Sequence, residues 1–226
     1  MINILLTGVG GQGTVLAAKV LAVAAATKGW QVRTAETIGM AQRGGSVVSH
    51  VRMGNLGEEV HAPLITHGTA DLIIAFEPGE AARVLPYLSK TGTMVTATTT
   101  VEPVSAALGD VDYSSKQIID SIQLSLYNAM VRNITRGKSR APKQAALIPI
   151  NDGSIIKRLG GNRKVLNSVM LAAAIAQDVI PLTLDELEDA IEVCVKPQYI
   201  EMNLQAIERT LDMIGAQVEQ PQQEEE

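Results

Sequence analysis

The sequence predicts an α/β fold with a doubly wound, mainly parallel sheet and additional C-terminal helices. Short apolar runs alternate with helical segments along most of the chain, which is typical of strand–helix–strand units. The first apolar run passes directly into a glycine-rich turn at the start of a helix. Hydrophobic residues make up 46% of the chain and aromatic residues only 3%, so aliphatic side chains must form closely packed α/β layers.

Composition excludes several classes of protein. The 226 residues carry a net charge of −5, which argues against a general nucleic-acid binder. The single cysteine, Cys194, excludes intrachain disulfides and a four-thiolate iron–sulfur cluster held by this chain alone. His50, His61 and His67 show no metal-ligand spacing, so no metal site is expected. No apolar stretch reaches the roughly 18 residues of a spanning helix, so we expect a soluble, cytoplasmic protein that does not enter membranes.

The N-terminal elements follow the expected alternation. Ile2–Thr7 is predicted as a buried strand, and Thr14–Lys28 as a helix that ends at Gly29. Val32–Glu36 is the second strand, which completes a unit of the kind that makes a right-handed parallel crossover. Residues 37–45, "TIGMAQRGG", have no usable periodicity and are predicted to form a loop.

The later elements continue this pattern. Val47–Met53 alternates as a strand, and Glu58–Pro63 is its expected hairpin partner. Further strands are expected at Asp71–Phe76, Thr93–Thr98 and Ala145–Ile150. The expected helices are Pro78–Ser89, Ser114–Asn128, a short turn from Asn151–Asp152, the amphipathic Lys164–Gln177, Leu184–Val195 with a Thr183–Glu186 capping box, and Tyr199–Ile214.

The expected organisation is a main domain followed by two C-terminal segments. We expect one domain over residues 1–178, a helical extension over 179–214 and an acidic, disordered tail over 215–226. The stretch "RNITRGKSRAPK" at 132–143 is basic, so it is either a solvated loop or a docking surface for a partner or a phosphate-bearing ligand. Its cations are Arg132, Arg136, Lys138, Arg140 and Lys143.

The glycine-rich turn has the spacing of a nucleotide-phosphate cradle. In "GVGGQGT", Gly8, Gly10 and Gly13 follow a strand and open a helix, whose free N–H groups suit a pyrophosphate. Glu36 lies about twenty residues further on, where an acid would hold a ribose hydroxyl. The same turn can serve packing alone, because glycine is tolerated wherever backbones come close. The chain offers no convincing His–Asp pair or carboxylate dyad for catalysis.

The loop after the second predicted strand should lie beside this turn. Loops that leave the carboxyl ends of strands share one edge of a doubly wound sheet. In "GMAQRGGSVVSHVR", residues 39–52, this geometry presents Arg43 next to Gly44 and Gly45. The loop is either a glycine-assisted turn with a surface arginine or a segment shaped to meet an anionic ligand or a neighbouring subunit.

Four motifs in order carry a family resemblance. These are the two glycine-rich stretches above, "ADLIIAFEPGEAARVLPYL" at 70–88 and "GNRKVLNSVMLAAAI" at 161–175. Together they resemble the gamma-type domain of the 2-oxoacid:ferredoxin oxidoreductases, which has a Rossmann-like sheet. The resemblance covers most of residues 1–178, and the Met40–Gly45 version of the loop is most similar to the indolepyruvate members. The basic stretch, at about 130–143, looks like an insertion, and the helices after Pro181 extend or vary the family's C-terminal part.

The resemblance implies a non-autonomous subunit. The family oxidatively decarboxylates 2-oxoacids to acyl-CoA with thiamine diphosphate, magnesium and iron–sulfur clusters that pass electrons to ferredoxin. It implies that thiamine diphosphate and the clusters belong to a large partner subunit, that this chain binds no cofactor alone, and that the substrate is indolepyruvate or another aryl pyruvate. The alternatives are a stand-alone NAD(P)- or flavin-binding oxidoreductase and a non-catalytic scaffold with the same fold.

The resemblance also implies which residues face a ligand or the partner, without assigning a catalytic residue to this chain. It implies that the first turn is structural or faces an anion, and that the second loop lies nearest the partner and the CoA side of the active site. A planar guanidinium in that loop suits a phosphate or carboxylate. The ligand- or interface-facing residues are Gly8, Gly10, Gly11, Gly13, Met40, Gln42, Arg43, Gly44 and Gly45.

Overall fold

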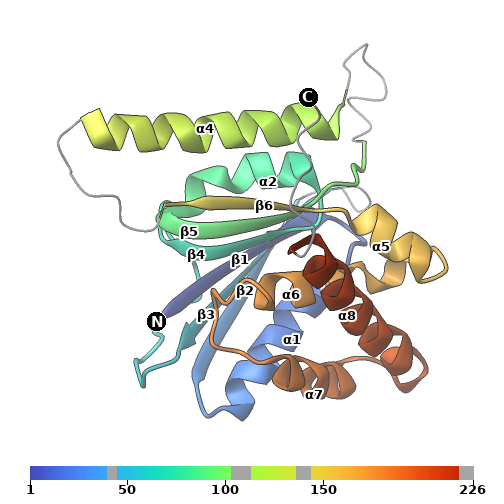
Figure 1. Cartoon of the computed structure of the whole chain (residues 1–226). Coiled ribbons are helices and arrows are strands. Elements are labelled where there is room, and N and C mark those ends of the chain that lie inside the picture. Colours follow the sequence, from blue (N-terminus) through green and yellow to red (C-terminus); the bar gives the residue numbers. More distant parts are fainter. Residues whose placement is uncertain (40–44, 103–112, 136–143, 219–226) are drawn as a thin grey trace.

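The computed structural model describes residues 1–39, 45–102, 113–135 and 144–218. Six strands in the described residues form one sheet in the order β2-β3-β1-β4-β5-β6 (Figure 1). β3 is antiparallel to both its neighbours, whereas β1, β4, β5 and β6 are mutually parallel, so the predicted fold class is confirmed. The strands are β1 (Ile2–Val9), β2 (Gln31–Ile38), β3 (Ser46–Gly54), β4 (Ala70–Ala75), β5 (Leu88–Ala97) and β6 (Ala146–Ile150).

Helices cover both faces of the sheet (Figure 1). One face carries α1 (Thr14–Thr27) and α6 (Leu166–Ile175), with α7 (Leu184–Cys194) and α8 (Pro197–Val218) packed outside them. The other face carries α2 (Pro78–Val84) and α4 (Ser115–Thr135), while α5 (Asp152–Arg158) follows β6; single 3-10 turns span Leu85–Tyr87 and Arg163–Val165. Within the described part of the chain, no helix is both long and apolar enough to cross a membrane.

The position of β3 sets the order of the strands in the N-terminal half and corrects one expectation. β2 runs parallel to β1, as a crossover unit requires, but β3 lies between them and is antiparallel to both, an arrangement that the sequence did not predict. Residues 58–63 form no strand, so the expected hairpin partner of β3 is wrong. The physical reason is that β1 and β2 already occupy both hydrogen-bonding edges of β3.

The helix predicted over Pro78–Ser89 is shorter than expected. α2 ends at Val84, one 3-10 turn follows, and Leu88 already belongs to β5. Pro86 explains the early end, because proline has no N–H to donate and its ring clashes with the preceding helical turn.

α6 is not the amphipathic helix that the sequence suggested. All ten of its residues are buried. This helix lies between the sheet and α8 and also contacts α1, so it has no face left for water.

The C-terminal helices share the core of the main domain. Leu187 and Ile191 of α7 and Ile207 of α8 belong to the same buried cluster as α1 and α6. The predicted capping box of α7 is confirmed, since Thr183 accepts from the Glu186 N–H and Glu186 accepts from the Thr183 N–H. The expected disordered tail begins too early, because residues 215–218 continue α8, and residues 219–226 lie outside the described residues.

Candidate functional site

The turn after β1 requires glycine for two different reasons. Gly11 and Gly13 have φ angles of 101° and 83°, in the left-handed region that favours glycine. Gly8 has no such angle, but a Cβ there would lie 2.7 Å from Gln12 Oε1 and 3.0 Å from both Phe76 Cβ and Thr14 Oγ1. Close packing against these side chains therefore explains Gly8, whereas backbone conformation explains Gly11 and Gly13.

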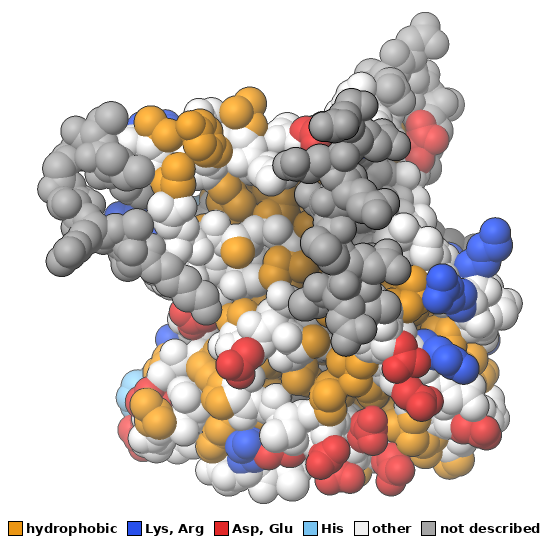
Figure 2. All heavy atoms as spheres, viewed as in Figure 1, with side chains coloured by type: hydrophobic (Ala, Val, Ile, Leu, Met, Phe, Trp, Pro, Cys, Tyr) orange, Lys and Arg blue, Asp and Glu red, His pale blue; other side chains and the backbone are white. Residues whose placement is uncertain are grey.

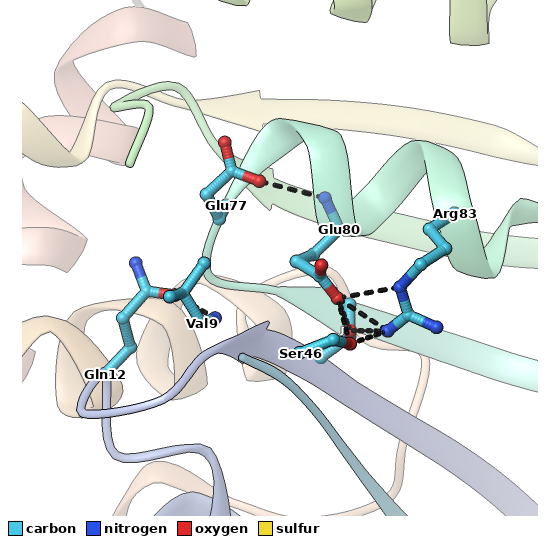
Figure 3. Close-up of polar contacts among 7 residues, drawn as sticks. Val9, Gln12, Ser46, Glu77, Glu80 and Arg83 are labelled. Carbon is cyan, nitrogen blue, oxygen red and sulfur yellow. Dashed lines mark hydrogen bonds and ion pairs between the residues drawn. The ribbon is translucent and has the colours of Figure 1, made fainter. Parts of the chain in front are cut away.

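Gln12 closes the turn from the inside, a role that the sequence reasoning missed. Its Oε1 accepts from the Val9 N–H at 2.7 Å (Figure 3), and its Nε2 donates to the Phe76 carbonyl oxygen at 2.9 Å. The amide thus joins the end of β1 to the end of β4. The available signal was a single polar amide among glycines, in "GGQG". Part of the concave side of the turn is therefore filled by the protein itself.

The two glycine-rich loops lie side by side, as predicted from the strand ends. The Gly10 N–H donates to the Gly45 carbonyl oxygen at 2.8 Å, and the Gly39 N–H donates to the Ser46 carbonyl oxygen at 2.8 Å. The base of the second loop is thereby fixed to the first turn. Met40, Gln42, Arg43 and Gly44 lie outside the described residues.

A polar cluster supports this loop base from α2 (Figure 3). Glu80 Oε2 accepts from Ser46 Oγ at 2.6 Å and from Thr7 Oγ1 at 3.2 Å. Arg83 donates through Nε to Glu80 Oε2 at 3.0 Å, and its Nη2 also contacts Ser46 Oγ. The Arg83 side chain is 46% exposed, so one cation remains accessible to solvent at this edge.

Glu77 is a buried carboxyl group at the end of β4. It is 1% exposed, and its Oε2 accepts from the Glu80 N–H at 2.9 Å, which caps α2. Tyr113 Oη donates to Glu77 Oε1 at 3.0 Å. Burial raises the pKa of Glu77 above its ordinary value, and burial together with the Glu77 charge raises the pKa of Tyr113. The structure gives this carboxyl group a capping role.

Asp152 plays the matching role at the ends of β5 and β6. It is fully buried, and its Oδ1 accepts from the backbone N–H groups of Thr98 and Thr99 at 3.0 and 2.9 Å. Arg163 donates to its Oδ2 at 3.3 Å. The sequence placed Asp152 only at the start of a helical turn, because partners 53 and 54 residues away leave no local signal.

Glu36 does not complete a dinucleotide fingerprint. It lies inside β2, is exposed and is in register with Ser49 of β3. Since adjacent strands are about 4.8 Å apart, the intervening β3 places Glu36 two strand spacings, roughly 10 Å, from β1. In the dinucleotide-binding arrangement the second strand pairs directly with the first. The strand order therefore argues against the interpretation of the first turn as an NAD-binding site.

Two further polar groups beside Gly13 were not anticipated. Thr14 Oγ1 and Asn167 Oδ1 are buried and have no hydrogen-bond partner among the described residues, and the Asn167 side chain lies 3.5 Å from where a Gly13 Cβ would be. Gly13 is the N-cap of α1, which has no side-chain cap. The backbone N–H groups at the start of α1 and these two polar side chains therefore lie close together at this edge.

The histidines and acids of the described residues form no metal centre. No group of three or more metal-ligating side chains comes together in this part of the chain. His50 is buried and accepts from the Ile65 N–H at 3.2 Å, and burial lowers the pKa of its imidazole. His61 and His67 are exposed. His50 is therefore a core histidine and the other two are surface residues.

Comparison with known proteins gives the family. The sequence model of the family described as pyruvate ferredoxin/flavodoxin oxidoreductase matches residues 3–213, which include α7 and most of α8. The chain is 34% identical to the indolepyruvate oxidoreductase subunit IorB of Thermococcus kodakarensis over 91% of this chain and 92% of that protein. It is 34% identical to the subunit of the same name from Methanothermobacter thermautotrophicus, over 96% and 98%.

Two solved structures, both of ferredoxin oxidoreductases, share the fold of this chain. The keto/oxoacid ferredoxin oxidoreductase gamma subunit from Geobacter sulfurreducens PCA aligns with a TM-score of 0.62 at 19% identity, over 96% of this chain and 99% of that one. The 2-oxoglutarate:ferredoxin oxidoreductase from Magnetococcus marinus, with 2-oxoglutarate, coenzyme A and succinyl-CoA bound, aligns at 0.64 and 17% identity over 95% of this chain and 31% of that one. From the family match and the relatives together, the chain belongs to the pyruvate ferredoxin/flavodoxin oxidoreductase family.

Proposed function

We propose that this chain is the non-autonomous subunit of a 2-oxoacid:ferredoxin oxidoreductase that converts indolepyruvate, or another aryl pyruvate, to the acyl-CoA and carbon dioxide. The observation that carries the proposal is 34–35% identity over 91% of the chain to indolepyruvate oxidoreductase subunits from Thermococcus, Pyrococcus and Archaeoglobus. Ferredoxin takes the electrons released in this oxidation.

The residues of this chain do not suit the cofactors that such a reaction needs. A [4Fe–4S] cluster takes four thiolates, and the sequence contains one cysteine. Among the described residues, no three His, Cys, Asp or Glu side chains come together in a group that could hold a metal ion. The proposal therefore assigns thiamine diphosphate, magnesium and the iron–sulfur clusters to a large partner subunit.

The contribution of this chain is the edge built by the two glycine-rich loops. In the proposal, this edge faces CoA or the partner subunit, with Arg43 presenting a guanidinium to a phosphate or carboxylate. Support comes from the bond between Gly10 and Gly45 and from the Glu80–Arg83 pair on Ser46, which fix the ends of both loops. The buried acids at the same edge are engaged by backbone N–H groups, which favours positioning rather than proton transfer.

The test is reconstitution of the complex from its source. The chain is co-purified with its partner and assayed for dye reduction that requires both indolepyruvate and CoA, and the assay is repeated with the partner alone. We expect activity only when both chains are present, and a preference for aryl pyruvates over pyruvate. Micromolar binding of NAD(H) to the isolated chain in calorimetry, with no partner recovered, would instead support the stand-alone oxidoreductase.

A further inference from the structure

A groove lies on the outer helical layer, between α7 and α8. It has a volume of about 590 Å³. Glu188 of α7 lines one side, and α8 contributes Pro197, Ile200, Glu201, Leu204 and Glu208. The glycine-rich edge contributes no residue to this groove, and the proposed reaction makes no use of it.

The groove combines an apolar floor with an acidic rim. Ile200 and Leu204 are one turn apart on α8 and are half-buried, so they form an apolar strip. Glu201 and Glu208 are exposed beside this strip, and Glu188 faces it from α7. Figure 2 shows acidic side chains gathered over the α7 and α8 region, with hydrophobic side chains between them.

The acidic groups around the groove are close enough to repel one another. Burial, followed by the charges of Asp185, Asp189, Glu192 and Glu208, raises the pKa of Glu188. The exposed Arg209 pairs with Asp212 at 3.5 Å, on the same helix. A cation brought in by another chain would offset this repulsion, and an apolar side chain beside it would cover the strip.

We infer that the α7–α8 groove binds an amphipathic segment of the partner subunit that carries Lys or Arg on both sides of an apolar residue. The apolar residue packs on Ile200 and Leu204, and the cations meet Glu201 and Glu208. Charge complementarity selects this occupant, since an acidic segment would add to the repulsion. The inference rests on the proposed function only in naming the partner subunit as the source of the segment.

The chemistry of the groove is tested on the full chain with a defined probe. The probe is a fluorescein-labelled helical peptide of Leu and Lys. A labelled Leu/Glu peptide of the same length is the acidic control. We expect the Leu/Lys peptide to bind and Glu201→Lys/Glu208→Lys to weaken it at least about tenfold, which corresponds to about 1.4 kcal/mol. Glu59→Lys/Asp120→Lys is the matched control, because these exposed acids change the net charge equally and neither lines the groove nor raises the pKa of Glu188. Equal losses in both double variants, or tight binding of the Leu/Glu peptide, would overturn the inference.

The occupant is tested in the co-purified complex. The groove variant is expected to weaken association with the partner subunit at least about tenfold, more at low than at high salt, while the control variant keeps it. Cross-links from residue 201 should map to a basic segment of the partner. Equal association of both variants with the partner subunit contradicts the inference.

A second copy of this chain is the alternative occupant. If the chain self-associates, and this self-association is lost when the basic residues of 136–143 are replaced by neutral ones, the segment comes from a second copy and the inference is wrong. If no partner is recovered with the wild-type chain, the proposed function fails. The peptide experiment still shows whether the groove binds a basic amphipathic segment.

Discussion

The carboxyl edge of the sheet has two halves that are built by different means. At the end of β1 and the start of β3, backbone groups of glycines make the contacts, as in the bond from Gly10 to Gly45. At the ends of β4, β5 and β6, the buried carboxylates of Glu77 and Asp152 accept from backbone N–H groups. The glycine half keeps its backbone close to whatever binds there, whereas the carboxylate half ties its loops to the sheet.

This difference explains why acids at a sheet edge are not automatically catalytic. A general acid or base needs a proton that a substrate can reach, within about 3 Å of the reacting group. Glu77 is covered by Tyr113 and the start of α2, and Asp152 is fully buried beneath Arg163. The carboxylate half should therefore control stability, and the glycine half should control function.

The largest expected effect is at Asp152. Asp152→Ala removes the acceptor of two backbone N–H groups and leaves Arg163 without its partner, so we expect a loss of roughly 3 kcal/mol in the free energy of unfolding. Denaturant titration measures this loss. Asp152→Asn keeps one acceptor oxygen and should lose less. An alanine variant within about 0.5 kcal/mol of wild type would contradict the structural role of this half.

Gly8 tests close packing in the glycine half. Gly8→Ala places a Cβ within 3.0 Å of atoms of Phe76 and Thr14, and we expect a loss of about 1–3 kcal/mol in stability. Gly215→Ala is the control, because a Cβ at this helical position meets open space and should be neutral or slightly stabilising. The measurement is the melting temperature of each variant, which should be lower for Gly8→Ala than for Gly215→Ala. Equal melting temperatures would show that Gly8 is not needed for packing.

Arg43 tests the function of the same half. Arg43→Ala in the assembled complex should raise the KM for CoA about tenfold, or weaken assembly with the partner by a similar factor, at unchanged stability of the chain. Arg33→Ala, on the exposed strand β2, controls for the loss of one surface cation. If Arg43→Ala leaves both the KM and assembly at the wild-type values, the proposed role of the loop is wrong.

The smallest expected effect is the pH dependence from Glu77. Because its pKa is raised in the folded chain, the neutral carboxyl group is favoured there, and this contribution is fully present below the unfolded value near 4.5. The contribution is lost as the pH rises through the folded pKa. Glu77→Gln keeps an oxygen for the Glu80 N–H and does not titrate. The stability of wild type relative to this variant should therefore fall as the pH rises above about 4.5, and a constant difference would contradict the burial effect.

Local signals in the sequence were sufficient for much of the fold. The apolar run before Gly8 and the capping box at Thr183 and Glu186 depend on residues close together in the chain, and the structure confirms both. The contact between the two glycine-rich loops was also predictable, from the rule that loops share a sheet edge.

Other features had no local signal. The expected hairpin at Glu58–Pro63 failed because β2 occupies that edge of β3. Helix α6 resembled a half-exposed helix because its sequence does not reveal that α8 covers it. In the site, the sequence reasoning assigned no role to Gln12, although its amide joins two strand ends.

The sequence by itself determined the α/β class, the glycine turn and the family to which the chain belongs, because these depend on residue type, short spacing and the order of motifs. Only the tertiary structure decided the strand order, the complete burial of α6 and the partners of Glu77 and Asp152. The physical reason is that pairing and burial are set by contacts between segments far apart in the chain. Asp152 shows this directly, since its backbone donors lie more than fifty residues away.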